Sequence, residues 1–236
     1  MLKKVSAIFV IVLSLTFAGC ASKEELVKST TELKEENAAL HQELKEYQKI
    51  DSLLEFYNKI TTSTVNSLVL VESTNKITSN KVYANGLVVA NDYYYYYVVT
   101  DYTALKQSGN NTYRVLDASA TVYSADIANR VDEESGLVLL RVDISRQTSI
   151  QMKTSDLGAS SNIYANVSSI NQINKVHVYS KLKTSTTFYN GTSYVSYTIE
   201  NAQNGSILIN NNNEVFGIYL SKLDCFINTT TLKAII

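Results

Sequence analysis

Short segments with a hydrophobic period of two residues follow one another from residue 61 to the end of the chain. They are rich in β-branched and aromatic residues and are separated by Asn, Gly, Ser and Asp, a pattern typical of antiparallel strands. The expected strands are SLVLVES, ANGLVVA, YYYYYVVT, ATVYSAD, GLVLLRVD, NKVHVYS, TTFYNGTSYVSYTIE, SILIN and EVFGIYL. The clearest hairpin turn is Asn190-Gly191. About 175 residues of this kind predict a mainly β domain, built as a sandwich or as barrels.

Residues 23–60 differ from the rest, because they are rich in Glu, Lys and Leu and contain no glycine. A heptad spacing relates Leu26, Leu33, Leu40, Tyr47 and Leu54. The alternate seam positions are Thr30, Asn37, Leu44 and Asp51. A single Asn in a seam often fixes a parallel dimer in register, whereas an Asp predicts that the seam weakens near residue 50. The segment is therefore predicted to be a helical stalk, either a dimeric coiled coil or one amphipathic helix that is solvated or packs on its own domain.

The N-terminus has the pattern of a secretory signal. Lys3 and Lys4 precede an apolar run from Val5 to Phe17, which is shorter than the roughly 20 residues that a membrane span needs. The run ends in F-A-G-C, which resembles the bacterial lipobox, whose cysteine is lipidated after cleavage. This predicts a signal peptide over residues 1–19 and a lipid anchor on Cys20. The plainer alternative is an ordinary signal peptide with an incidental cysteine.

Charge and metal-ligating residues exclude several classes of function. The net charge of −1 gives no reason to expect binding to nucleic acid. The two cysteines, Cys20 and Cys225, cannot form a disulfide framework. The two histidines, His41 and His177, do not cluster with acids or cysteines, so neither a metal nor another cofactor is predicted.

Three segments of the β region resemble trypsin-like serine peptidases, nearest the bacterial high-temperature-requirement branch. The segment GLVVANDYYYYYVVTDYTAL is similar to the strand-turn-strand that ends in V-T-x-x-H-V, where the histidine is the general base. The segment ATVYSADIANRVDEESGLVLLRVD is similar to the one that carries the catalytic acid in D-L-A-V-L-K-V. The segment NGSILINNNNEVFGI resembles S-G-G-P-L-L-N…G-E-V-I-G-I, which carries the nucleophile. The resemblance covers residues 61–223 and implies a two-β-barrel fold over residues 61–236, preceded by the stalk.

The catalytic residues of that family are not carried over. The position of the histidine falls on Thr103, that of the aspartate on Gly136, and that of the serine on Asn204. Thr103 cannot accept a proton near neutral pH, Gly136 offers no carboxylate, and Asn204 has no nucleophilic hydroxyl. Since loss of a triad costs on the order of a million-fold in turnover, the resemblance implies a degenerate peptidase.

Other residues leave alternatives open. Ser206 lies two residues after Asn204 and is a candidate nucleophile for a rearranged site. His177, on an expected strand, favours a structural or surface role over a catalytic one. The run Tyr93–Tyr97 is expected to alternate faces of a strand, either as an exposed stacking surface or as part of a packed barrel. Cys225 is expected to be a buried small hydrophobe.

These observations favour a non-catalytic, binding or scaffolding lipoprotein of the bacterial cell surface, anchored to the extracytoplasmic face of the membrane through Cys20. Its expected partners are the membrane, a second copy through residues 23–60, and a protein or peptide ligand that the sequence does not identify. One alternative is a serine-type peptidase of trypsin-like fold with a rearranged site. The other is an unrelated β-sandwich with an adhesion or envelope-structural role.

Overall fold

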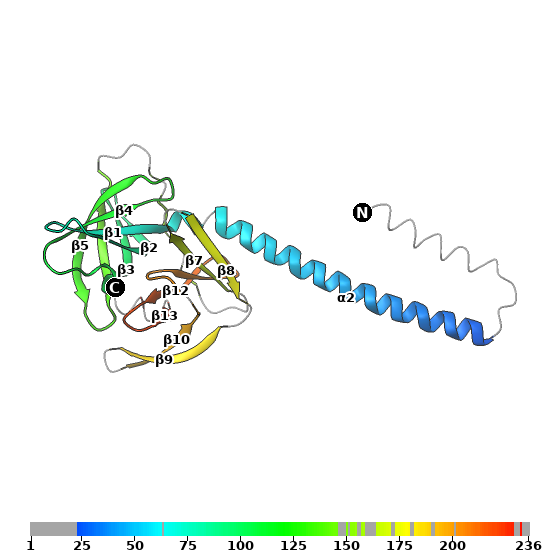
Figure 1. Ribbon diagram of the computed structural model, residues 1–236. Helices are drawn as coiled ribbons and strands as arrows, with labels where there is room; N and C mark the ends of the chain where they lie inside the picture. The colour runs from blue at the N-terminus through cyan, green and yellow to red at the C-terminus, as the bar shows by residue number, and fades with distance from the viewer. Residues whose placement is uncertain are drawn as a thin grey trace. The chain divides into compact units, whose positions relative to one another are not determined.

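The computed structural model confirms a mainly β chain preceded by a long helix (Figure 1). It describes residues 23–62, 64–145, 150, 152–154, 157–158, 164–170, 173–179, 182–189, 192–200, 202–228 and 232. The predicted signal peptide, Cys20 and the expected turn at Asn190-Gly191 lie outside the described residues. Among the described residues, no helix combines the length and apolar character needed to cross a bilayer.

The heptad segment forms one helix, α2 (Lys23–Thr62). Its large apolar side chains are exposed along the predicted seam, including Leu33, Leu40, Leu44, Tyr47 and Leu54. The chain divides into two compact units after Leu54, somewhat before the predicted boundary at residue 60. The difference arises because Phe56 and Ile60, one turn apart, are buried in the core of the β unit, so the last turns of the helix belong to that unit.

The first six strands form a closed antiparallel barrel in the order β1-β2-β3-β6-β5-β4 (Figure 1). The strands are β1 (Leu68–Asn75), β2 (Lys81–Asn91), β3 (Tyr95–Asp101), β4 (Asn111–Leu116), β5 (Val122–Asp132) and β6 (Leu137–Asp143). A 3₁₀ turn, η1 (Thr64–Ser67), leads into β1, and the one-turn helix α3 (Tyr102–Leu105) follows β3. β1 closes the barrel by pairing with β4, and alternate valine and leucine side chains fill its interior.

The remaining strands form a seven-stranded antiparallel sheet in the order β8-β7-β11-β12-β13-β10-β9. They are β7 (Tyr164–Ile170), β8 (Ile173–Tyr179), β9 (Lys183–Tyr189), β10 (Thr192–Thr198), β11 (Ile207–Asn210), β12 (Val215–Leu220) and β13 (Cys225–Asn228). β8 and β9 are its edge strands. Three strands, β4, β7 and β13, were not predicted from the sequence.

The sheet repeats the neighbour relations of the barrel. In this comparison β7 corresponds to β1 and β10 corresponds to β3. The strands β11, β12 and β13 correspond to β4, β5 and β6, in that order. Each pairing of the barrel then has a counterpart in the sheet. The place of β2 is shared by two strands, since β8 pairs with β7 and β9 pairs with β10. The sheet therefore has the strand order of a second six-stranded barrel that is open between β8 and β9.

One apolar core joins the barrel to the sheet. It combines Leu87 of β2 and Val99 of β3 with Ile207 of β11, Ile218 of β12 and Ile227 of β13, all of them fully buried. Of the three catalytic positions that the resemblance assigns, Thr103 lies just after β3, Gly136 just before β6, and Asn204 shortly before β11.

Candidate functional site

The segment that carries Thr103 begins at the end of β3. Asp101 is fully buried, and its side chain caps α3 by accepting a hydrogen bond from the Ala104 N–H at 3.3 Å. Its Oδ2 accepts a second, stronger bond at 2.7 Å from the N–H of Ser221, in the turn after β12. Thr103 is exposed on this short helix. The buried acid thus ties the segment that carries Thr103 to the second sheet.

Gly136 lies beside Thr103, in the turn between β5 and β6. Its carbonyl accepts a hydrogen bond from the Tyr102 N–H at 2.7 Å, and its φ of +76° is in the left-handed region that favours glycine. A Cβ at this position would collide with Oγ1 of Thr103 and lie 3.1 Å from Cβ of Lys222. The structure therefore brings these two predicted positions together, but leaves no room there for the side chain of an aspartate.

Asn204 lies in a tight turn that packs against β2. Its carbonyl accepts hydrogen bonds from the N–H of Asn85 at 2.8 Å and from Nδ2 of Asn85 at 3.1 Å. Gly205 has φ +70° and donates its N–H to the Tyr219 carbonyl at 3.1 Å. A Cβ on Gly205 would collide with the Asn85 carbonyl, so the close approach of two backbones requires glycine here. The Asn-Gly turn that the sequence indicated is therefore present, held against the first barrel.

Ser206, the alternative nucleophile, is fully buried. Its backbone donates to the Gln203 carbonyl and accepts from the Tyr219 N–H, both at 2.9 Å. Its Oγ has no hydrogen-bond partner among the described residues. A hydroxyl without a base in contact and without access to solvent is not activated for attack.

The turn between β12 and β13 covers the Thr103–Gly136 pair. Ser221 donates to Asp101, and the Nζ of Lys222 donates to the Glu133 carbonyl in the β5–β6 turn. The alkyl stem of Lys222 packs over Gly136. Sequence reasoning missed Asp101 and Lys222. The only signal for Asp101 was an acid directly after the V-T pair, and nothing near Lys222 pointed to this place.

The remaining candidates lie apart from this turn. His177 is exposed on β8, Cys225 is buried as expected, and no group of three potential metal ligands occurs in the described part of the chain. The tyrosine run does not alternate along one strand. Tyr93 and Tyr94 are exposed in the turn before β3, because Asp92 accepts the N–H groups of Tyr94 and Tyr95 and thereby closes the turn.

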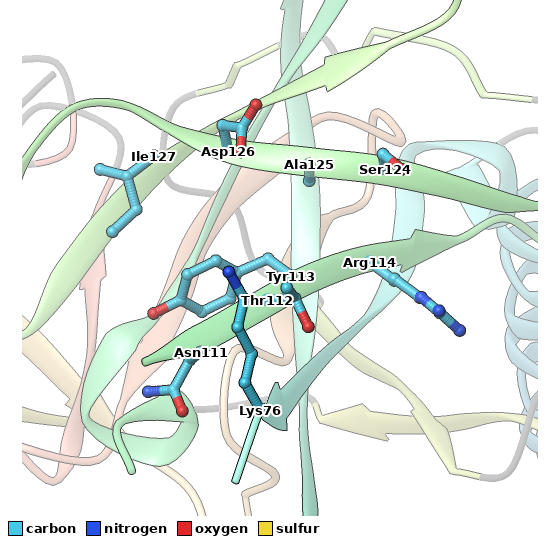
Figure 2. Close-up of a pocket in the computed structure, with 9 residues that line it drawn as sticks. All are labelled: Lys76, Asn111, Thr112, Tyr113, Arg114, Ser124, Ala125, Asp126 and Ile127. Carbon is cyan, nitrogen blue, oxygen red and sulfur yellow. The ribbon is translucent and has the colours of Figure 1, made fainter. Parts of the chain in front are cut away.

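A pocket of about 530 Å³ opens in the wall of the barrel between β4 and β5 (Figure 2). Its lining residues are Lys76, Asn111, Thr112, Tyr113, Arg114, Ser124, Ala125, Asp126 and Ile127. Oδ1 of Asn111 is buried there and has no hydrogen-bond partner among the described residues. Lys76 and Arg114 are both exposed at its mouth.

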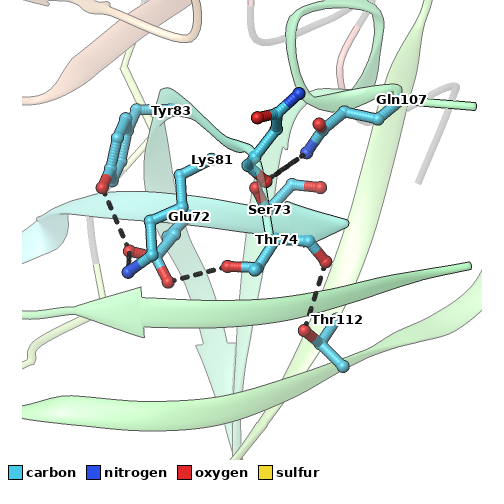
Figure 3. A network of polar contacts seen from close by, with 8 residues as sticks. Glu72, Ser73, Thr74, Lys81, Tyr83, Gln107 and Thr112 are labelled. Atoms are coloured by element: carbon cyan, nitrogen blue, oxygen red, sulfur yellow. Dashed lines mark hydrogen bonds and ion pairs between the residues drawn. The ribbon is translucent and has the colours of Figure 1, made fainter. Parts of the chain in front are cut away.

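A buried carboxylate lies close to this pocket. Glu72 on β1 accepts hydrogen bonds from Lys81 at 2.9 Å, Thr74 at 3.0 Å and Tyr83 at 3.1 Å (Figure 3). Burial pushes the pKa of Glu72 upward, but these hydrogen bonds and the charge of Lys81 outweigh it and hold the pKa below its ordinary value. Thr112, which lines the pocket, donates to the Thr74 carbonyl at 3.3 Å. Because every contact of Glu72 stabilises its ionised form, the network favours a structural role over proton transfer.

No protein-family model matches this chain, and no curated protein is similar enough to it to count as a relative.

Proposed function

We propose that this chain is a membrane-anchored bacterial lipoprotein whose β unit is a catalytically silent, trypsin-like domain with a binding or scaffolding role. Cys20 carries the lipid in this proposal, and residues 23–60 hold two copies together as a parallel coiled coil. The exposed leucines along α2 support the coiled coil, because an apolar seam that faces water is stabilised when a second helix covers it.

The strand order supports the two-barrel form of the proposal. A closed six-stranded barrel is followed by a sheet with the same neighbour relations, as expected of a fold made of two like barrels. Of the three positions that the resemblance assigns to the triad, Thr103 follows β3 and Gly136 precedes β6 in the barrel, whereas Asn204 precedes β11 in the sheet.

The observation that carries the loss of catalysis is the packing around Gly136. A general base needs a positioned partner, and the place for a carboxylate beside Thr103 is filled by Thr103 itself and by Lys222. Asp101, the buried acid of this region, is already engaged by the N–H groups of Ala104 and Ser221. The space that catalysis would use is occupied by contacts that join the barrel to the sheet.

The alternative of a rearranged serine peptidase would need Ser206 at a surface and beside a base, whereas Ser206 is buried and its hydroxyl has no partner in the described part of the chain. The sandwich alternative is disfavoured by the closed barrel of the first six strands. The silent peptidase fold is therefore the better-supported proposal.

Labelling of the full chain in detergent with a fluorophosphonate probe tests this proposal. Ser206→Ala is the matched control, since it removes an unpartnered hydroxyl and should leave the fold intact. We expect the wild-type chain to be labelled no more than this variant and to cleave no denatured protein substrate. Stoichiometric labelling that Ser206→Ala abolishes would return the protein to the serine hydrolases.

A further inference from the structure

The pocket in the barrel wall lies where two rungs of a β-ladder are missing. β4 and β5 pair from Leu116↔Val122 to Tyr113↔Ala125. Continuing this register would pair Thr112 with Asp126 and Asn111 with Ile127, yet these four residues line the pocket instead. The two strands diverge there, as Figure 2 shows.

Each diverging strand end is held on its other side. On β4, Thr112 pairs with Thr74 and Asn111 with Asn75 of β1. On β5, Asp126 pairs with Arg141 and Ile127 with Leu140 of β6. Both walls of the gap are therefore fixed before any ligand arrives. Because main-chain groups alternate sides along a strand, one residue of each pair directs its N–H and C=O into the gap.

The side chains around the gap differ between its outer and inner rims. Thr112, Arg114, Ser124 and Asp126 are exposed on the outer rim, where Lys76 also lies. Asn111, Tyr113 and Ile127 are partly buried on the inner rim. A strand laid into the gap would turn successive side chains outward and inward in the same way.

The charges at the mouth favour an anionic ligand. Lys76 and Arg114 form no ion pair among the described residues, and Asp126 is the one acid among the residues that line the pocket. The net charge of the lining is positive, from two cations and one anion.

We propose that this gap binds an extended peptide segment in which acidic and apolar side chains alternate. The peptide adds main-chain hydrogen bonds to the free edges of β4 and β5, as in β-strand addition. Its acidic side chains face Lys76 and Arg114, and its apolar side chains face Tyr113 and Ile127. The inference rests on the proposed binding role and identifies the class of ligand.

The test uses the full chain in detergent and a fluorescent, acetylated and amidated peptide, Thr-Glu-Val-Glu-Thr. Anisotropy should show saturable binding that weakens as salt is added, because exposed charges are screened. The Lys76→Gln/Arg114→Gln double variant should bind at least fivefold more weakly, and Asp126→Asn more tightly. Lys183→Gln, which removes an exposed cation of the second sheet, should bind like the wild type. Thr-Lys-Val-Lys-Thr should not bind.

Hydrogen exchange with mass spectrometry supplies the second measurement. Bound peptide should slow exchange in fragments that contain residues 111–112 and 126–127. Absence of binding up to about 1 mM peptide, equal binding to the double variant, or protection only elsewhere in the chain would each overturn the inference. The proposed function would survive those results as long as the chain stays inert to the fluorophosphonate probe, so the two failures are distinguishable.

Discussion

Replacing Asp101 by alanine should loosen the junction between the barrel and the sheet. The change removes the 2.7 Å bond from the Ser221 N–H and the 3.3 Å cap of α3 at once. A hydrogen bond to a charged group contributes about 1.5–3 kcal/mol, and loss of an N-cap costs about 1 kcal/mol. The Ser221 N–H would also be left without its carboxylate partner in a partly buried place. We therefore expect unfolding free energy to fall by about 3 kcal/mol.

The assay is urea unfolding of the full chain, followed by the near-ultraviolet circular dichroism of tyrosine. Fifteen of the 17 tyrosines lie beyond residue 61 and only Tyr47 and Tyr57 lie in α2, so the signal reports the β unit. With a slope of about 2 kcal/mol per molar urea, the midpoint should fall by about 1.5 M. Asp101→Asn keeps one acceptor oxygen, because Oδ1 and Oδ2 of the aspartate each accept one of the two bonds, and should cost about 2 kcal/mol. Thr103→Ala, at an exposed site, should stay within about 0.5 kcal/mol of the wild type. If Asp101→Ala behaves like Thr103→Ala, the junction does not depend on this acid and the reasoning is wrong.

Four further predictions test other parts of the molecule. Cys20→Ser should leave an unprocessed or detergent-independent species, and unchanged processing with unchanged membrane association would contradict lipidation. Leu33→Ala with Leu40→Ala should convert a dimer of the full chain into a monomer in sedimentation, whereas a wild-type monomer would favour a single helix. Gly136→Asp should produce no hydrolytic activity and should lower the free energy of unfolding in urea by about 2–4 kcal/mol, because the φ of residue 136 is positive and the space around its Cβ position is filled. A variant as stable as the wild type would refute that packing argument. Burial raises the pKa of Asp117, but hydrogen bonds from Ser119, Tyr123 and Thr121 outweigh this effect and hold the pKa below its ordinary value of 3.8. The loss of stability in Asp117→Asn should therefore be full above pH 3.8 and should shrink as the pH falls through the lower pKa of the folded state. A loss of stability that does not depend on pH would contradict the assignment.

Sequence periodicity was sufficient for the helix, through its heptad spacing, and for most of the strands, because the buried faces of those strands are apolar. It failed for β7, where Asn166 and Ser168 occupy buried positions and hide the two-residue period. It also failed for β13, Cys225–Asn228, a short run that directly follows the turn after β12. β4 was missed because the polar residues Thr112 and Arg114 interrupt its pattern, so that only its last two residues form an apolar run.

The candidate site was predictable in position but not in content. The resemblance placed Thr103 and Gly136 in turns that the structure brings into contact, and it placed Asn204 in a tight turn before β11. It said nothing of Asp101 with Ser221, which are 120 residues apart, or of the gap between β4 and β5. Those features depend on pairing between strands that are distant in the sequence. A local pattern of residues does not indicate at which residues the pairing of two strands stops.

The packing around Thr103, Gly136 and Asn204 bears on where a binding role can reside. A cleft that binds substrate must keep free space beside its nucleophile, but here Gly205 meets the Asn85 backbone and Gly136 meets Thr103 and Lys222. These contacts stabilise the fold by joining the barrel to the sheet, and a ligand could enter only by breaking them. The gap between β4 and β5 has the opposite character, since its walls are fixed by β1 and β6 and its polar groups line a pocket. If the stalk is a parallel dimer, two such gaps are carried at the same end of the coiled coil. A ligand with two acidic strands, or two linked copies of one, would then bind more tightly than a single peptide, because the second contact forms at a high effective concentration.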